Sequence, residues 1–111
     1  MTVTARPIVS AQYAPNAETT LYTAGAGTRT IIDKCTAYNS DTASQLITFK
    51  LVPSGGSAGA SNVIVAKTLT AGETYTFPEV VGHVLEAGGF VSSLAGVANK
   101  IVVRMSGREV T

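Results

Sequence analysis

The sequence is poor in the residues on which most enzyme and metal sites depend. Among its 111 residues there is no tryptophan, one cysteine (Cys35) and one histidine (His83), and charged residues make up only 14%, against about 25% in average proteins. A lone cysteine excludes an internal disulfide and a cysteine-based zinc site. A lone histidine without a nucleophile motif such as G-x-S-x-G does not indicate a catalytic triad. We therefore expect a protein that is not an enzyme and has no cofactor or metal site.

Charge and hydropathy argue against two further classes. The net charge is +1 and the basic residues are scattered singly, which does not indicate nucleic-acid binding. No apolar stretch reaches 18 residues, so no membrane span is expected, and the first residues lack the apolar region of a signal peptide. The scarcity of charge has two explanations that the sequence leaves open. Either another protein covers part of the surface, or Thr, Ser and Asn take the place of charged residues there.

Apolar and polar residues alternate along most of the chain, with Ile47, Phe49 and Leu51 in one run and Ile101, Val103 and Met105 in another. This period of two is typical of strands with one buried face. Turn segments rich in Gly, Asn and Asp separate expected strands at 28–39, 44–52, 63–69, 74–77, 83–86 and 90–94. Residues 78–84 form either a short helical turn or a bent crossing. The pattern predicts an all-β domain, an antiparallel β-sandwich or a barrel-like roll, with Cys35 packed inside.

Two glycine-rich segments, AGAG at 24–27 and SGGSAGAS at 54–61, raise the question of a phosphate site. A phosphate-binding loop needs Gly-Lys-Ser/Thr at the start of a helix, whereas both segments lead into expected strands. We interpret the first as a turn and the second as a hairpin tip. The tip is a candidate partner contact through Ser54, Gly55, Gly56 and Ser57.

The first 18 residues differ from the rest, because they contain Pro7 and Pro15 and show little alternation. Proline lacks the N–H that a central strand needs, so the segment is an extended arm or an irregular edge strand. Burying one large apolar side chain stabilises by roughly 1.5–3 kcal/mol, which favours docking onto the protein's own fold or onto a neighbour. We divide the chain into an N-terminal arm (1–18) and a sandwich domain (19–111). The candidate anchors in the arm are Arg6, Ile8, Val9 and Tyr13, and removing residues 1–12 is expected to abolish attachment without unfolding the domain.

Three stretches, LVPSGGSAGASN, LTAGETYTFPEVVGHVLEAGGFVSS and KIVVRMSGREV, resemble small virion structural proteins of tailed bacteriophages. In size and character the chain is similar to the capsid decoration, or cement, proteins of some short-tailed phages. This resemblance implies a sandwich or jelly-roll fold, synthesis in the bacterial cytoplasm and a final place on the capsid exterior. It also implies a homodimer that binds the major capsid protein and staples its lattice. A tail or fibre-associated structural protein is the alternative, and a small carbohydrate-binding sandwich is the second.

Overall fold

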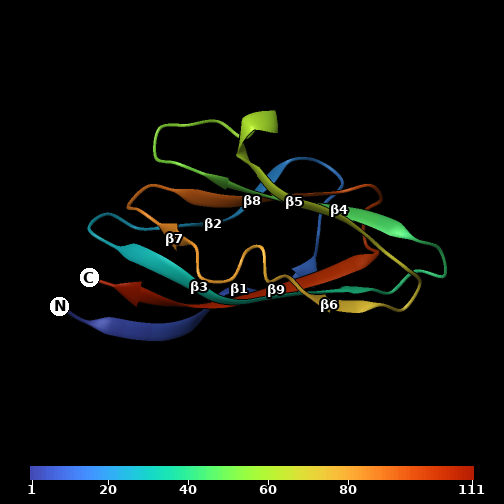
Figure 1. Cartoon of the computed structure of the whole chain (residues 1–111), viewed down its shortest axis with the longest axis horizontal. Coiled ribbons are helices and arrows are strands. Elements are labelled where there is room, and N and C mark those ends of the chain that lie inside the picture. The colour runs from blue at the N-terminus through green and yellow to red at the C-terminus, as the bar shows by residue number, and fades with distance from the viewer.

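The structure, a computed structural model, describes residues 1–111 as an all-β protein. Two antiparallel sheets lie face to face, and both chain termini lie at the same end (Figure 1). The only helical element is a short 3-10 turn, η1, in the loop between β4 and β5. The strands are β1 (Val3–Tyr13), β2 (Thr19–Thr23), β3 (Arg29–Asn39), β4 (Gln45–Val52), β5 (Val63–Leu69), β6 (Thr74–Thr76), β7 (Val84–Leu85), β8 (Phe90–Ala95) and β9 (Ile101–Val110), and η1 covers Ala60–Asn62. The expected all-β class is confirmed.

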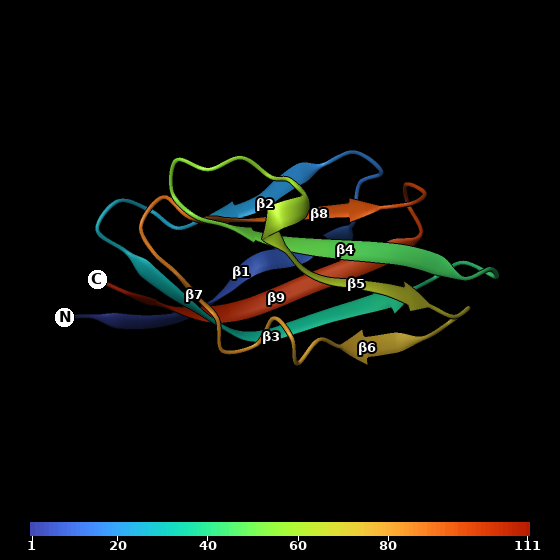
Figure 2. The ribbon, with the colours of Figure 1, turned by 45° about the horizontal axis from the view of Figure 1, so that its top comes forward.

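The strands are paired as a set of nested hairpins. The first sheet has the order β1-β9-β3-β6, with β7 also paired to β3, and the second has the order β2-β8-β4-β5. Along the chain, the innermost pair is β4 with β5, followed by β3 with β6 and β7, then β2 with β8 and finally β1 with β9. Figure 2 shows β9 running between β1 and β3, so this strand is covered on both sides by hydrogen-bonded neighbours.

The core lies between the two sheets and draws on both of them. From β9 the side chains of Ile101, Val103 and Met105 are 0% exposed, and from β4 so are Ile47 and Phe49. These are the positions that the alternation assigned to the buried face. Cys35 is also buried, and burial raises the pKa of its thiol to about 12, which confirms the expectation of a packed and unreactive cysteine.

Aromatic side chains link the two sheets at the side where β5 and β6 form the edges. Phe49 in β4 meets Phe77 edge to face, with ring centroids 5.1 Å apart, and Phe77 meets Tyr75 in the same way at 4.8 Å. The Lys67 Nζ in β5 lies 4.5 Å from the Tyr75 ring centroid. Edge-to-face pairs add to the free energy gained by burial, so these four side chains stabilise the otherwise open side of the sandwich.

Most strand boundaries agree with the alternation, but three local features differ. The sequence did not predict β2 as a strand. Residues 78–82, expected as a short helical turn or a bent crossing, form a hydrogen-bonded turn in which the Val80 and Val81 N–H groups donate to the Phe77 oxygen over 3.2 and 3.3 Å. In β4 a register shift between Phe49 and Lys50 interrupts the alternation, and Lys50 is only 9% exposed. Its ammonium group pairs with Glu18, whose carboxylate also accepts a hydrogen bond from Ser92.

The N-terminal segment docks onto its own fold as an irregular edge strand. β1 pairs with β9 from Val3 to Tyr13, with two register shifts on the way. Ile8 and Val9 are 6% and 1% exposed and belong to the core. The separate arm expected for these residues is therefore not what the structure contains at 3–13, and deleting residues 1–12 would remove part of the core.

A polar cluster links the two sheets near the chain termini. The Tyr22 hydroxyl of β2 donates to the Glu109 carboxylate of β9 and lies 2.7 Å from the Thr30 hydroxyl of β3. The Arg6 guanidinium of β1 donates to the same carboxylate over 3.2 Å. The hydrogen bond from Tyr22, together with that from Arg6 and the charge of Arg6, lowers the pKa of Glu109 against the opposing effect of burial.

We predict that Ile8→Ala lowers the free energy of unfolding by about 2–5 kcal/mol, because it leaves a cavity in the core. Urea unfolding followed by circular dichroism measures this change. Thr4→Ala is the control, since Thr4 is exposed in the same strand and surface substitutions stay within roughly 0.5 kcal/mol. Equal stability of the two variants would mean that β1 does not contribute to the core.

We predict that the fold loses stability in acid through Glu109. Its folded pKa lies below its usual value of 4.5, so the carboxylate stabilises the fold above that pH and the contribution is lost as the pH falls through the folded pKa. Between about pH 6 and pH 3, the free energy of unfolding should therefore fall less for Glu109→Gln than for the unaltered chain. The matched control is Glu86→Gln, which removes the surface ion pair with Arg29. Identical slopes for Glu109→Gln and the unaltered chain would contradict the prediction.

Candidate partner interface

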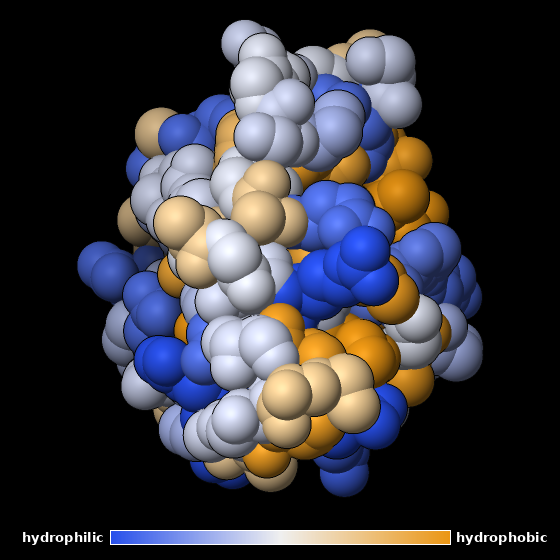
Figure 3. All heavy atoms as spheres, turned by 90° about the vertical axis from the view of Figure 1, so that its left-hand side faces the viewer, coloured by the Kyte–Doolittle hydropathy of each residue, from blue (hydrophilic) through white to orange (hydrophobic).

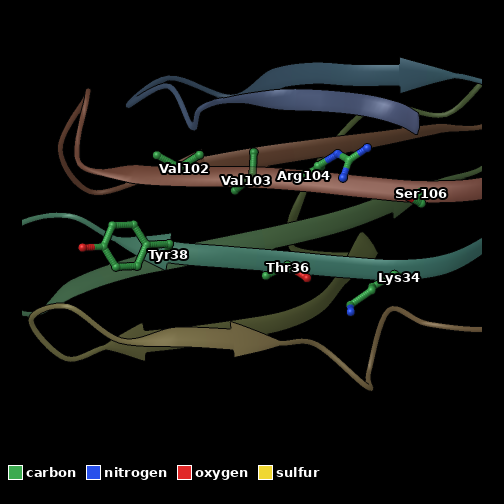
Figure 4. A pocket seen from close by; sticks show the side chains of 7 residues that line it. All are labelled: Lys34, Thr36, Tyr38, Val102, Val103, Arg104 and Ser106. Carbon is green, nitrogen blue, oxygen red and sulfur yellow. The ribbon is translucent and has the colours of Figure 1, made fainter. Parts of the chain in front are cut away.

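The outer face of the first sheet carries a shallow hollow of about 280 Å³ across β3 and β9. Its lining side chains alternate with core residues in both strands, so one side of each strand is buried and the other faces outward. The lining comes from Lys34, Thr36 and Tyr38 of β3 and from Val102, Arg104 and Ser106 of β9, and the core residue Val103 also lines the hollow (Figure 4).

Strand pairing gives the hollow two chemically different ends. Tyr38 lies opposite Val102, Thr36 opposite Arg104, and Lys34 opposite Ser106. Figure 4 shows the Tyr38 ring and Val102 at one end, with Lys34 and Arg104 toward the other. A partner group therefore meets an aromatic and aliphatic surface at one end and two cations at the other.

Tyr13 extends the aromatic end onto a third strand. In β1 it lies opposite Val102, on the side away from Tyr38. Tyr13 is 50% exposed and Tyr38 is 42% exposed. Exposed tyrosines are enriched at protein interfaces, because they bury a large ring and keep a polar tip. Tyr13 is the one sequence-derived anchor that the structure places beside this hollow.

The two cations of the hollow have no anionic partner within the chain. Lys34 and Arg104 are exposed, take part in no ion pair, and stand diagonally across β3 and β9. Diagonal neighbours on one sheet face lie roughly 7–8 Å apart. Arg108, further along the same face of β9, differs because its guanidinium donates to both oxygens of Asp33 at 2.9–3.1 Å. The free positive charge of this face thus lies at Lys34 and Arg104.

The structure does not bring the other sequence-derived candidates together. Arg6 is bound to Glu109, and the burial of Ile8 and Val9 leaves them almost no surface for a partner. Residues 54–57 are exposed in the loop between β4 and β5 of the second sheet. Ser54 lines a separate hollow of about 210 Å³ with Val84 and Glu86. This loop and Tyr13 therefore belong to different surfaces.

A further hollow of about 350 Å³ lies at the end of the molecule that carries the termini, lined by Arg29, Ile31, Val84, Glu86 and Val110. Figure 3 shows this end, where hydrophobic atoms lie exposed among strongly hydrophilic ones. The Arg29 guanidinium donates to Glu86 over 3.0 Å, so the charges here neutralise each other. This hollow is apolar and internally paired, in contrast to the hollow on β3 and β9.

The chain's single histidine and its acidic residues lie apart from one another in metal-binding terms. No three His, Cys, Asp or Glu residues gather closely enough to hold a metal ion. His83 is exposed in the turn before β7, where its carbonyl oxygen accepts the Ile32 N–H over 3.0 Å. No helix is long and apolar enough to cross a membrane.

Sequence reasoning missed Lys34, Thr36, Tyr38 and Arg104 as members of one surface. The period-two spacing of the first three within β3, and of Arg104 between core positions in β9, was visible in the sequence. The missing information was that β3 and β9 are neighbours, since the paired residues Thr36 and Arg104 are far apart along the chain.

Comparison of the chain with protein-family models, with curated proteins and with solved structures finds no match. The interface therefore has to be interpreted from its own geometry and charge.

We predict that Arg104→Glu leaves the fold as stable as before or stabilises it by up to about 1 kcal/mol, because it replaces a diagonal repulsion with an attraction to Lys34. The free energy of unfolding is measured at low salt and again in about 0.5 M salt, where the difference should shrink. Arg104→Gln is the control for charge removal alone. A loss of more than about 1 kcal/mol for both variants would show that Arg104 serves the fold and not a partner.

Proposed function

We propose that this chain is a structural virion protein that binds the outside of a phage capsid and staples the major capsid protein lattice. The observation that carries the proposal is the nested antiparallel pairing of β1 with β9, β2 with β8, β3 with β6 and β7, and β4 with β5. A five-stranded and a four-stranded sheet connected in this way support a jelly roll, an architecture that viral capsid domains use. The resemblance of the sequence to decoration proteins is consistent with this interpretation.

The surface chemistry supports binding to a protein surface. An exposed sheet face with two tyrosines and a free arginine has the residue types that contribute most to protein interfaces. A standard interface buries about 800 Å² on each partner, which is roughly a seventh of the 5499 Å² surface of this chain. One sheet face is therefore large enough to supply it.

The proposed role follows from simple mechanics. A head filled with DNA presses outward on its shell, so the contacts between capsid subunits carry load. A chain that bridges two subunits adds interface that must break before they separate, and many such bridges in one lattice act together. A sandwich with a close-packed core transmits that load with little deformation. Dimerisation of the chain, which the resemblance implies, would let one unit reach two subunits.

The test compares filled heads with and without the chain. We expect heads stripped of it to release their DNA at a lower temperature, as reported by a dye that fluoresces on free DNA, and saturating purified chain to restore the original temperature. An unrelated sandwich protein at the same concentration is the control. Unchanged release temperatures would overturn the proposal. A stained gel of intact particles separates the alternatives, because a decoration protein is present in hundreds of copies and a tail or fibre component in about a ring's worth.

A further inference from the structure

Almost every cation of the chain already has a partner within the fold. Of the eight Lys and Arg residues, five form ion pairs and Lys67 lies over the Tyr75 ring. The five ion-paired cations are Arg6, Arg29, Lys50, Lys100 and Arg108. The remaining two are Lys34 and Arg104, and both line the same hollow. In a chain with so few charges, two free cations side by side on a central sheet face require an explanation.

The acidic residues are distributed in the opposite way. Of the seven Asp and Glu residues, only Asp33 lies beside this face, where Arg108 binds it. The other six interact with groups elsewhere, namely Glu18 with Lys50, Asp41 with Gln45, Glu73 with Thr70, Glu79 with Tyr75, Glu86 with Arg29 and Glu109 with Tyr22. The face is thus locally positive although the net charge of the chain is only +1.

Lys34 and Arg104 form no ion pair that would stabilise the fold. Like charges at diagonal positions repel each other weakly, and neither side chain is buried against the core. A bound carboxylate would remove this repulsion and form charge-assisted hydrogen bonds with the Arg104 guanidinium and the Lys34 ammonium group. The hydroxyls of Thr36 and Ser106, which lie between and beside the cations, offer further donors to the same group.

We propose that the outer face of β3 and β9 binds an acidic segment of a partner protein, with carboxylates on Lys34 and Arg104 and an apolar side chain against Tyr38 and Val102. The proposal deepens the proposed function and rests on it in one respect, namely that the partner is a capsid protein. The apolar requirement follows from the aromatic end of the hollow, where Tyr38 and Tyr13 flank Val102.

Single-stranded nucleic acid also combines anionic groups with surfaces that stack on aromatic rings, but the charge of this face fits it less well. Affinity for nucleic acid comes chiefly from several phosphate contacts that release counterions. Here only two cations are free, and Asp33 stands next to Lys34. One or two carboxylates on a protein segment match this charge, whereas a continuous phosphate backbone exceeds it.

The experiment uses a fluorescently labelled peptide of Asp, Glu and Leu residues, with labelled oligothymidine as the competing probe. We expect the peptide to bind with a dissociation constant below about 1 mM at low salt and to bind more weakly as salt is added. Amide shifts in nuclear magnetic resonance spectra should concentrate at Lys34, Thr36, Tyr38 and Arg104. The double variant Lys34→Ala/Arg104→Ala should weaken binding at least about tenfold, since each cation loses a charge-assisted contact.

The matched control is Arg29→Ala/Lys100→Ala, which removes the same net charge from two exposed ion pairs. It should keep peptide affinity within about twofold, because surface ion pairs contribute little to the fold. No binding, equal weakening in both double variants, or shifts on another surface would overturn the proposal. Tighter binding of oligothymidine on the same face would also overturn it and make nucleic acid the occupant.

The same variants, assayed on filled heads, separate this proposal from the proposed function. If the unaltered chain binds heads and the Lys34→Ala/Arg104→Ala variant binds equally well, stapling stands and the acidic-segment proposal fails. If the unaltered chain does not bind heads, stapling fails, while the peptide assay, which contains no capsid, still decides the chemistry of the face.

Discussion

The alternation of side chains along β9 is the constraint on which the rest of the structure depends. This strand lies between β1 and β3, with Ile101, Val103 and Met105 wholly buried on one side and Val102, Arg104 and Ser106 on the other. A slip of one residue would move Arg104 into the core and Met105 out of it, at a large cost in free energy. Gly107 adds a local restriction, because a Cβ there would come within 2.6 Å of the Ile31 carbonyl oxygen. Core packing therefore sets the register of β9 against β3, and that register places Arg104 beside Lys34.

The sequence predicted the strands well where burial is one-sided and where glycine marks the turns. β5 was predicted with its observed bounds, and Gly27, Gly72 and Gly88 have the positive φ angles that turns of this kind need. The failures have a common cause, which is that they depend on contacts between distant residues. Ile8 and Val9 are buried only because β1 pairs with β9, and Lys50 can be buried because Glu18 lies next to it. The candidate face was missed for the same reason, since a single strand does not reveal its neighbour.

The low charge of the chain acquires a physical explanation from these contacts. Two explanations were open, a surface covered by a partner or a surface of uncharged polar residues. The structure shows uncharged polar residues at outward positions, which is the second explanation. Threonines and serines occupy outward positions beside the hollow, as at Thr36, Thr76 and Ser106, and most ionic groups neutralise one another within the fold. Lys34 and Arg104 are the two cations with neither an ion pair nor an aromatic ring as partner, so the free positive charge that the chain can offer a partner lies in one small area.

The position of that area also bears on how strongly it can bind. A face in the middle of a sheet is already rigid, because β3 and β9 are hydrogen-bonded to neighbours along most of their length, so binding orders only a few side chains there. The loop at residues 53–62 contains three glycines, and fixing such a loop on a partner costs more conformational entropy. For equal contact area the sheet face is the better docking surface. Under the proposed function, a chain with so little charge gains most from two free cations that lie where the backbone does not have to be ordered.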